Sequence, residues 1–340
     1  MSFQITIQPS GHSCVAEEGV TILQAALDAG LTLPYGCRNG ACGSCKGKLL
    51  TGEVDYGDAQ ESALTEADKA AGLALFCCAR PRSDVVIECR EVASINDIPV
   101  RTMPCRVHQL ERLAPDVMAL SLKLPTNERL LFRAGQYLEI LLKDGKRRAF
   151  SLANAPHDDA LLQLHIRLTP GGLFTEHVFT TLKERDILRF EGPHGSFFLR
   201  EDSAKPIILL AGGTGFAPLK SIVEHAIHNQ IARPMTLYWG ARDRAGLYLP
   251  ELPPRWAAEH RHIQYHAVLS DADAAYAWTG RRGLVHLAVL EDHADLSGHQ
   301  VYACGAPAMI DAARRDFIAH GLPEEEFFAD AFTFAGDMKT

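Results

Sequence analysis

The chain has 340 residues, which predicts two or three domains, and its composition of 47% apolar and 22% charged residues is ordinary for a globular protein. A formal net charge of −8 argues against a nucleic-acid partner, and no apolar run approaches the roughly 20 residues that span a membrane. The N-terminal MSFQITIQPS lacks the basic and apolar regions of a signal peptide. Nine cysteines in such a chain indicate reduced thiols and metal ligation, so we expect a cytoplasmic protein.

The first 92 residues have the pattern of a small compact unit. Residues 20–29 predict a helix with Gly30 just past its end, and Thr65 is the expected cap of a second helix. Short strands are expected at residues 3–8, 13–16, 46–50 and 85–89. The segment carries 7 Lys or Arg against 12 Asp or Glu, a balance of −5. That sign suits docking to a basic partner, although a solvated surface explains it equally well.

Four cysteines in this unit have the spacing of metal ligands. The segment PYGCRNGACGSCKG contains Cys37, Cys42 and Cys45 as C-x4-C-x2-C, and Cys77 follows in LFCCARP. This is the plant-type arrangement for a [2Fe–2S] cluster, in which four thiolates hold two irons. Glycines in the loop let the backbone wrap closely and direct N–H groups at sulfur. The sequence therefore predicts a [2Fe–2S] cluster on these four cysteines.

A structural zinc site is the alternative for these cysteines, but such sites usually show two C-x2-C knuckles, and this chain has one. Cys78 is expected not to be a ligand. The other thiols lie in strand-like surroundings and are expected to be buried and inert. They are Cys14, Cys89 and Cys105.

The middle of the chain predicts an antiparallel β-barrel. Residues 93–104, with two prolines, have the composition of a linker. Short alternating runs then recur with turns between them, and they leave room for one helix near 175–181. The expected strands are 105–110, 117–124, 137–142, 148–152, 161–168 and 187–190.

From residue 204 the pattern changes to strands that alternate with helices, which predicts an α/β domain with a parallel sheet. The apolar strand 207–210 runs into a glycine-rich turn and then into a helix at 219–228, with Pro218 near its start. Further strands are expected at 235–239, 263–268 and 300–304, and a further helix at 308–319.

Four short motifs, taken together and in this order, resemble the ferredoxin–NADP reductase superfamily over about residues 103–335. They are Arg148-Ala-Phe-Ser-Leu152, Gly171-Gly-Leu-Phe-Thr175, Gly212-Gly-Thr-Gly-Phe-Ala-Pro218 and Cys304-Gly-Ala-Pro307. The family's flavin motif is R-x-[YF]-S followed by G-G-x-x-[ST]. The N-terminal unit resembles the β-grasp fold of plant-type ferredoxins. The resemblance therefore implies three domains, at residues 1–93 (ferredoxin), 103–200 (FAD-binding β-barrel) and 204–340 (NAD(P)-binding α/β).

The resemblance also implies roles for the residues of the flavin motif. Arg148 would bind the flavin diphosphate, together with the backbone N–H groups of residues 172–175 at a helix N-terminus. Phe150, where Tyr is commoner, would pack on the isoalloxazine, and Ser151 would reach the flavin N5. Cofactor contacts are expected across the two segments, at Arg148, Phe150, Ser151, Leu152, Gly171, Gly172 and Thr175. Residues 193–197, PHGSF, resemble a segment at the end of the family's barrel, with a structural turn as the alternative.

In the last domain the glycine-rich turn would let the backbone approach the dinucleotide pyrophosphate. Cys304 would lie beside the nicotinamide C4 and the flavin N5, with a buried strand-end cysteine as the alternative. Phe332 or Phe334 would lie against the flavin, although core packing explains either one nearly as well. The expected nucleotide-site residues are Gly212, Gly213, Thr214, Gly215, Cys304, Gly305 and Phe332, with Ser151 and Cys304 at the reacting atoms.

These motifs imply an oxidoreductase with FAD, a [2Fe–2S] cluster and NADH, or NADPH, as electron source. The order of domains resembles CDP-6-deoxy-Δ3,4-glucoseen reductases and the reductase components of mono- and dioxygenases, so the partner is expected to be a dehydratase or an oxygenase component. The ending Phe-Ala-Asp-Ala-Phe-Thr favours the former family. A non-enzymatic electron carrier or redox sensor is the alternative of a different class. Arg242 and Arg244 could attract a 2′-phosphate, which would favour NADPH, whereas Asp243 would repel that phosphate and could bind a free 2′-hydroxyl. These two signals nearly cancel, and the family resemblance tips the expectation to NADH.

Overall fold

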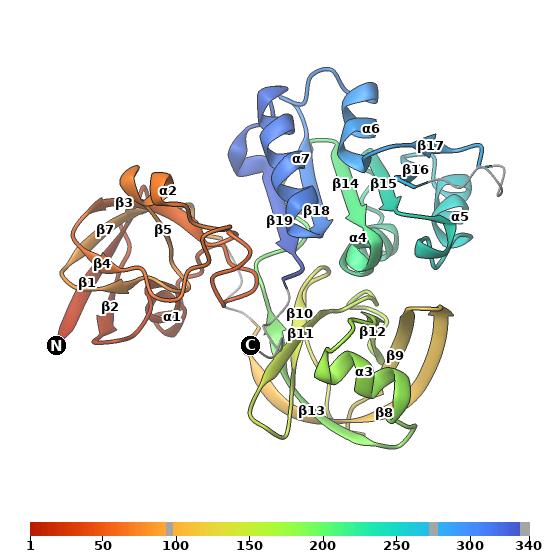
Figure 1. The fold of residues 1–340 in the computed structure, drawn as a ribbon, viewed down its shortest axis with the longest axis horizontal. Coiled ribbons are helices and arrows are strands. Elements are labelled where there is room, and N and C mark those ends of the chain that lie inside the picture. Colours follow the sequence, from red (N-terminus) through yellow and green to blue (C-terminus); the bar gives the residue numbers. More distant parts are fainter. Residues whose placement is uncertain (93–97, 272–277, 334–340) are drawn as a thin grey trace. The chain divides into compact units, whose positions relative to one another are not determined.

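The computed structural model describes residues 1–92, 98–271 and 278–333, which fall into two compact units. Unit 1 consists of Met1–Pro99 together with His194–Phe197, and unit 2 contains the remaining residues. Figure 1 labels the elements of each. Among the described helices, none is long and apolar enough to cross a membrane.

Unit 1 has the β-grasp arrangement, a mixed five-stranded sheet in the order β2-β1-β7-β3-β5. The strands of the sheet are β1 (Ser2–Gln8), β2 (Ser13–Glu17), β3 (Lys46–Thr51), β5 (Leu73–Leu75) and β7 (Val85–Glu88), and β4 (Val54–Asp55) and β6 (Arg80–Pro81) form a separate two-stranded sheet. The helices of the unit are α1 (Ile22–Asp28) and α2 (Glu66–Ala70). The apolar side chains of α1 and of the central strands form one buried core, which includes Ile5, Ile22 and Ile87.

Local signals in the sequence explain where the two helices of unit 1 begin and end. Thr21 caps α1, because its hydroxyl accepts a hydrogen bond from the Gln24 N–H, so the helix starts two residues later than predicted. Gly30 follows its end with a φ of 76°, a left-handed conformation that favours glycine. Thr65 caps α2 as predicted, in a capping box with Asp68.

Unit 1 also includes a segment from far along the chain. The Tyr35 N–H donates to Ser196 Oγ at 2.9 Å, and both the Ser196 hydroxyl and the Ser196 N–H donate to the Tyr35 carbonyl. The side chain of Ser196 is buried. These bonds hold the backbone two residues before Cys37, which gives the segment His194–Phe197 a structural role within this unit.

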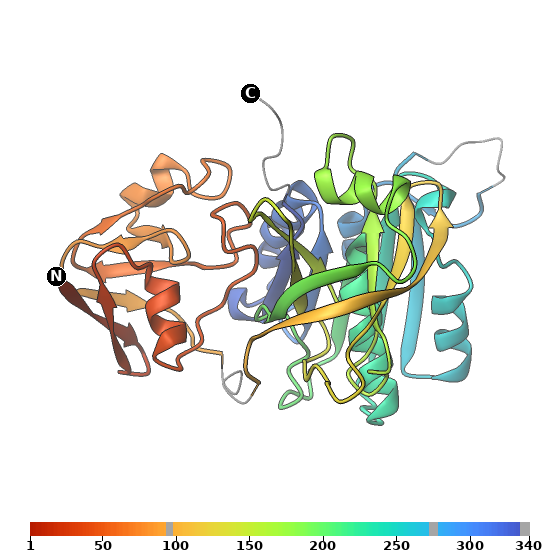
Figure 2. The same cartoon turned by 90° about the horizontal axis from the view of Figure 1, so that it is seen from below.

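The first half of unit 2 is the antiparallel barrel that the sequence predicts. Its strands lie in the order β11-β10-β13-β8-β9-β12, and a bridge between Leu152 and Leu164 joins the two outer strands. Figure 2 shows the long curved strand β8, drawn in orange to yellow. The elements are β8 (Arg101–Ala114), β9 (Val117–Lys123), β10 (Tyr137–Leu141), β11 (Arg147–Ser151), β12 (Leu162–Arg167), β13 (Ile187–His194) and α3 (Leu173–Thr180).

The predicted linker at 93–104 is too long at its C-terminal end. Residues 93–97 lie outside the described residues, but β8 already begins at Arg101, so Pro104 lies within a strand. Pro104 pairs with Arg189 of β13, whereas β9 pairs with β8 only from Arg106 onward. A proline lacks the N–H that a second neighbour would need, and here it has only one neighbouring strand.

The second half of unit 2 is a parallel sheet with helices between its strands. The strand order is β17-β16-β15-β14-β18-β19, and Figure 1 shows β14 beside β18. The elements are β14 (Ile207–Gly212), η1 (Gly213–Gly215), α4 (Phe216–His228), β15 (Met235–Ala241), η2 (Arg244–Gly246), α5 (Leu252–Glu259), β16 (Ile263–Leu269), β17 (Arg281–Arg282), α6 (Val285–Asp292), β18 (Gln300–Gly305), α7 (Pro307–Ala319), η4 (Glu324–Glu326) and β19 (Phe327–Ala331).

The strand order of this sheet fixes where a ligand can bind. From β14 the chain moves outward through β15 and β16, and then returns to β18 on the other side of β14. Because crossovers between parallel strands are right-handed, α4 and α5 cover one face of the sheet and α6 and α7 cover the other. A crevice forms at the carboxyl ends of the strands where the direction reverses, between β14 and β18.

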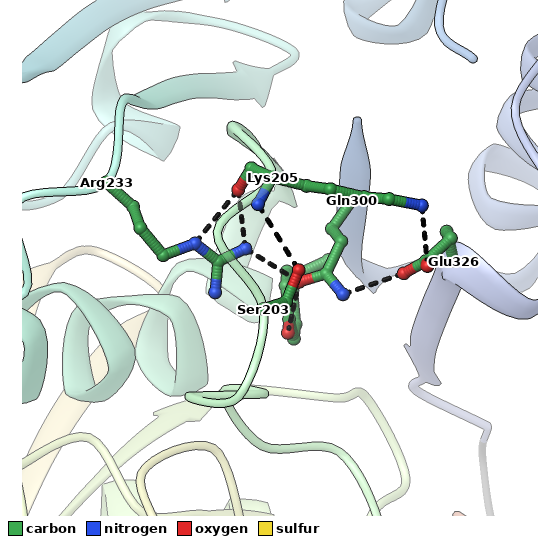
Figure 3. Close-up of polar contacts among 6 residues, drawn as sticks. Ser203, Lys205, Arg233, Gln300 and Glu326 are labelled. Carbon is green, nitrogen blue, oxygen red and sulfur yellow. Dashed lines mark hydrogen bonds and ion pairs between the residues drawn. The ribbon is translucent and has the colours of Figure 1, made fainter. Parts of the chain in front are cut away.

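A buried arginine forms hydrogen bonds to the segment that joins the barrel to the parallel sheet (Figure 3). Arg233 is 8% exposed and donates hydrogen bonds to the main-chain carbonyls of Arg200 and Lys205 and to the side-chain oxygen of Gln300. Gln300 in turn donates to Glu326 at 2.7 Å, and Glu326 forms an ion pair with Lys205. These hydrogen bonds and the ion pair therefore connect the joining segment to the first residue of β18 and to the residue before β19.

Candidate functional site

The four predicted cluster cysteines come from two loops of unit 1. Cys37, Cys42 and Cys45 lie between α1 and β3, and Cys77 lies between β5 and β6. The Cys37 N–H donates to Cys42 Sγ at 3.4 Å, and the Cys77 N–H donates to Cys45 Sγ at 3.5 Å. The structure thus brings the cysteines together as two pairs, Cys37 with Cys42 and Cys45 with Cys77.

This arrangement in pairs fits a cluster of two irons better than a single zinc ion. A zinc ion holds four ligands at about 2.3 Å from one centre, so all four sulfurs must be mutual neighbours. Among the described residues, no three cysteine sulfurs lie within 4.8 Å of one another. Two pairs, each facing its own metal ion, are what a [2Fe–2S] cluster requires.

Hydrogen bonds to the sulfur atoms favour the thiolate form at one member of a pair. The Cys42 thiol and the N–H groups of Asn39, Ala41 and Cys42 lower the pKa of Cys37 to about 7. The shared hydrogen bond and burial raise the pKa of Cys42 well above its usual range. In the other pair, the hydrogen bond with Cys45 raises the pKa of Cys77 to about 12.

Cys78 is the nearest competitor for the fourth ligand position. Its sulfur lies 3.7 Å from that of Cys77, and the contact with Cys77 and burial raise its pKa. A side chain at Gly40 would meet Cys78 Sγ at 2.7 Å, so glycine is required where the ligand loop packs over this thiol. The assignment of Cys77 rather than Cys78 as the fourth ligand stays a prediction.

The three remaining cysteines of the β-rich regions show no sign of metal ligation. Cys14 and Cys105 are buried, and Cys89 is half-buried. Burial raises the pKa of Cys14 to about 11 and the pKa values of Cys89 and Cys105 to about 12. Thiols of this kind are unreactive near neutral pH.

The predicted flavin motif lies on β11, next to the N-terminus of α3. The ring of Phe150 lies 5.4 Å from that of Phe174, in the first turn of α3. Arg148 is half-buried, and burial lowers its pKa, so its charged form would gain from a bound anion. The strand and the helix thus place a guanidinium and a helix N-terminus in one region, which fits a diphosphate.

The start of α3 already binds a negative group in this structure. The Gly171 N–H donates to Glu176 Oε1 at 2.7 Å, and Gly172, the cap residue, offers no capping side chain. Glu176 is exposed, so its carboxylate stands in for an anion at these N–H groups. Thr175 binds the backbone of Thr169 through its hydroxyl, which fixes the turn before the helix.

A buried cluster of Ser151, Cys304 and Asp330 lies where β11 meets the parallel sheet. The Ser151 hydroxyl donates to Asp330 Oδ2 at 3.3 Å, and Cys304 Sγ lies 4.0 Å from the same oxygen. Cys304 and Asp330 are register partners on β18 and β19. Burial raises the pKa of Asp330 to about 6, and it raises the pKa of Cys304 well above its usual range.

The two glycine-containing motifs of the nucleotide domain interlock at the crevice between β14 and β18. A side chain at Gly215 would meet the Cys304 carbonyl oxygen at 2.0 Å, and one at Gly305 would meet the backbone of Gly212 at 3.0 Å. Thr214 is buried between them. These glycines are therefore required for close packing of the two strand ends, in addition to any approach to a pyrophosphate.

Two residues of this region were not predicted from the sequence. Asp330 belongs to β19, a strand that was not expected. Arg167 ends β12, and its guanidinium carbon would lie 3.3 Å from a side chain at Gly213. Its Nη2 is buried and forms no hydrogen bond within the described part of the chain. We infer that Arg167 offers this group to the dinucleotide pyrophosphate; an arginine just before Gly171-Gly172 was the available signal.

The other predicted contacts are placed as follows. Leu152 is fully buried in the barrel core, and its N–H donates to the Gln136 carbonyl, so its contact with a cofactor stays a prediction. Phe332 is half-buried, and its N–H donates to the Gly305 carbonyl at 2.8 Å, which holds it beside the end of β18. Phe334 lies outside the described residues.

We expect the protein to prefer NADH to NADPH, by about tenfold in kcat/KM, which corresponds to ~1.4 kcal/mol. Asp243 follows β15, where the adenosine ribose is expected, and its carboxylate is fixed by a 3.0 Å bond from the Gly246 N–H. A fixed carboxylate would repel a 2′-phosphate. Steady-state kinetics with both nucleotides measure the preference.

Asp243→Asn is the matched variant for this expectation, because the amide oxygen can still accept the bond from Gly246 while the charge is lost. The ratio of kcat/KM values should then move toward NADPH. If the parent protein instead prefers NADPH, Arg242 and Arg244 face the ribose and Asp243 does not.

Comparisons with known proteins agree with the three predicted cofactors. Family models for a 2Fe-2S iron-sulfur cluster binding domain, an oxidoreductase FAD-binding domain and an oxidoreductase NAD-binding domain match residues 5–82, 104–199 and 209–315. The chain is 44% identical over 332 residues to the CDP-6-deoxy-L-threo-D-glycero-4-hexulose-3-dehydrase reductase of Yersinia pestis, with 98% of this chain and 99% of the relative covered.

Oxygenase reductases are similar over the same length. The reductase component DmpP of phenol 2-monooxygenase from Pseudomonas sp. is 38% identical over 343 residues, which cover 99% of this chain and 96% of the relative. Among solved structures, the Amycolatopsis cytochrome P450 reductase GcoB aligns with a TM-score of 0.79 and 35% identity, over 98% of this chain and all of that one.

Proposed function

Because the chain belongs to the iron–sulfur flavoprotein reductases, we propose that it delivers electrons from NADH to a dehydratase of a nucleotide-linked deoxyhexose. Proteins of this family join a plant-type ferredoxin domain to the FAD- and NAD-binding domains of the ferredoxin–NADP reductase superfamily. The observation that carries this proposal is the 44% identity with the Yersinia pestis dehydrase reductase over 98% of the chain. The FAD- and NAD-binding domains make the protein an oxidoreductase and argue against the non-enzymatic carrier considered above.

When bound, FAD would supply the chemistry that accepts a hydride from NADH and releases electrons one at a time to the [2Fe–2S] cluster. In this proposal Arg148 and the N-terminus of α3 bind the flavin diphosphate, and Phe150 packs beside the ring. Ser151 orients the reacting edge of the flavin, and Cys304 and Asp330 line the place where the nicotinamide ring arrives. The glycine-rich turn and Arg167 hold the dinucleotide pyrophosphate.

The roles of the ferredoxin unit follow from its ligands. We propose that Cys37, Cys42, Cys45 and Cys77 hold the cluster from which single electrons leave to the partner protein. The N–H groups that surround Cys37 stabilise negative charge on sulfur, which a cluster carries in each oxidation state. All nine cysteines are unpaired, which agrees with work in the reducing cytoplasm.

An oxygenase component is the second candidate acceptor, because an oxygenase reductase is 38% identical over nearly the full chain. The experiment supplies the holoenzyme and NADH with either a CDP-6-deoxy-4-hexulose 3-dehydrase and its substrate or the oxygenase component of a phenol monooxygenase. NADH bleaching of the flavin absorbance is measured first, as a check that the reductase is active. We expect NADH consumption and product formation with the dehydrase. Turnover with the oxygenase alone would overturn the proposed acceptor and leave the reductase function intact.

A further inference from the structure

Arg38, the residue after the first cluster cysteine, is held in an unusual conformation. Its φ is 60°, which few residues other than glycine, asparagine and aspartate adopt. Its side chain is half-buried, and its Nη2 donates to the side-chain oxygen of Gln24 on α1 at 3.1 Å. The backbone conformation and the bond to Gln24 together fix where the guanidinium lies.

The guanidinium shares a small hollow with a cluster ligand. A cavity of about 330 Å³ beside the start of α1 has Arg38, Gln24 and Cys77 among its lining residues. Cys77 comes from the other ligand loop, 39 residues further along the chain. Arg38 therefore adjoins the first ligand in the chain and lines the same hollow as the fourth.

The charge of Arg38 is not neutralised by a neighbouring acid. Its partner Gln24 is neutral, and the Gln24 amide group donates to Asp28 at 2.7 Å. Within the residues that the structure covers, no carboxylate forms an ion pair with Arg38. Some other cations of unit 1 are paired, namely Lys46 with Asp68 at 3.1 Å, Lys69 with Glu66 at 2.7 Å and Arg82 with Asp55 at 2.6 Å.

We propose that Arg38 stabilises the reduced form of the cluster and that Gln24 is the positioning residue that holds its charge in place. Reduction adds one electron from the flavin to the cluster, with no bond broken, and so adds one negative charge. A fixed cation in a partly buried site favours that change. This inference rests on the proposed function, because it requires the [2Fe–2S] cluster on the four named cysteines.

The test compares Arg38→Gln with Arg38→Lys in the full-length holoprotein, after iron and sulfide content show a full cluster in each. An EPR-monitored redox titration measures the cluster, and the flavin potential in the same sample is the internal reference. At the potential where half of the parental clusters are reduced, we expect the ratio of reduced to oxidised cluster in Arg38→Gln to be about tenfold lower. This is the effect that Coulomb's law gives for a unit charge about 12 Å from the added electron at an effective dielectric of about 20. For one electron that is a shift of about 59 mV to more negative potential.

Control variants separate charge from backbone strain. Arg38→Lys keeps the charge and should titrate near the parent, and Arg82→Gln removes a paired cation elsewhere in unit 1 and should not change the potential. Gln24→Leu should give an intermediate shift, because the charge remains but is no longer held. If Arg38→Gln does not assemble a cluster, Arg38→Asn carries the test, since asparagine tolerates positive φ.

Two results would overturn the inference while the proposed function stands. One is a parental potential in Arg38→Gln, and the other is an equal shift in Arg38→Gln and Arg38→Lys, which would assign the effect to the backbone. A parent protein that binds FAD but assembles no iron–sulfur cluster would instead overturn the proposed function itself.

Discussion

Replacing any one of Cys37, Cys42, Cys45 or Cys77 with serine should remove the visible absorbance and the iron of the cluster and stop electron delivery to one-electron protein acceptors. NADH-dependent reduction of cytochrome c should fall by more than about a hundredfold, since loss of even an outer-shell partner reduces the function of metal sites by 10–100-fold. Reduction of ferricyanide by NADH should persist, because FAD in unit 2 can serve that acceptor alone.

The matched control for this series is Cys78→Ser, which removes a thiol 3.7 Å from Cys77 and should leave the cluster in place. Iron content, visible absorbance and the two acceptor assays are measured on each purified variant. A cluster lost in Cys78→Ser but kept in Cys77→Ser would reverse the assignment of the fourth ligand. Cytochrome c reduction at the parental rate by a cluster-free variant would contradict the linear path from flavin to cluster.

The second large effect concerns Asp330. Hydride transfer leaves the nicotinamide ring with a positive charge, and an ionised carboxylate beside Cys304 would stabilise that charge as it forms. Since burial raises the pKa of Asp330 to about 6, the carboxylate is protonated below that pH and ionised above it. We therefore expect the rate constant of flavin reduction by NADH to rise with pH through about 6. Stopped-flow absorbance at a series of pH values measures it.

Asp330→Asn should lower this rate constant at pH 8 on the order of a hundredfold, the effect of removing one preorganised electrostatic group, and should flatten its dependence on pH. Ser151→Ala is the companion variant, because it removes the hydroxyl that donates to Asp330 at 3.3 Å but leaves the carboxylate. The pH-dependent step should survive in it. A step near pH 6 that persists in Asp330→Asn would assign the titration to another group.

The same pKa shift predicts an opposite effect of Asp330→Asn on stability. Folding raises the pKa of this carboxyl from 3.8 to about 6, so between these pH values the unfolded chain releases a proton that the folded chain keeps. The folded state is thus destabilised as pH rises through this window, by a few kcal/mol at most. Asp330→Asn should melt at a higher temperature than the parent at pH 8, and the difference should shrink toward pH 4.

The sequence was most informative where chemistry depends on spacing within one segment. The C-x4-C-x2-C loop predicted which of its cysteines lie together, though not how they pair. Alternating or continuous apolar runs predicted the barrel and the parallel sheet within one or two residues at most strand ends. The glycine-rich turn was also predicted, but not the contact of Gly215 with the Cys304 carbonyl. That contact joins two strands about 90 residues apart, so no local pattern reveals it.

The residues that were missed depend on pairing between distant strands. Phe327–Ala331 is short and contains a buried acid, Asp330, which weakens any strand pattern, and it becomes β19 because β18 pairs with it in register. Pro104 favoured a linker by its intrinsic preference, yet the partner strand β13 accepts it at an edge. In each case pairing with a strand that is distant in the sequence sets the conformation. The sequence alone does not show which strands become neighbours.

The hydrogen bonds of Arg233 determine what must be kept when domains are exchanged between such proteins. Arg233 binds the main-chain carbonyls of Arg200 and Lys205, atoms that every residue type has, so these hydrogen bonds do not depend on the side chains of the connecting peptide. One connector side chain does contribute, because Lys205 forms an ion pair with Glu326. A chimera that grafts this domain onto another reductase's barrel therefore needs to preserve the length of the connector and the side chain of Lys205.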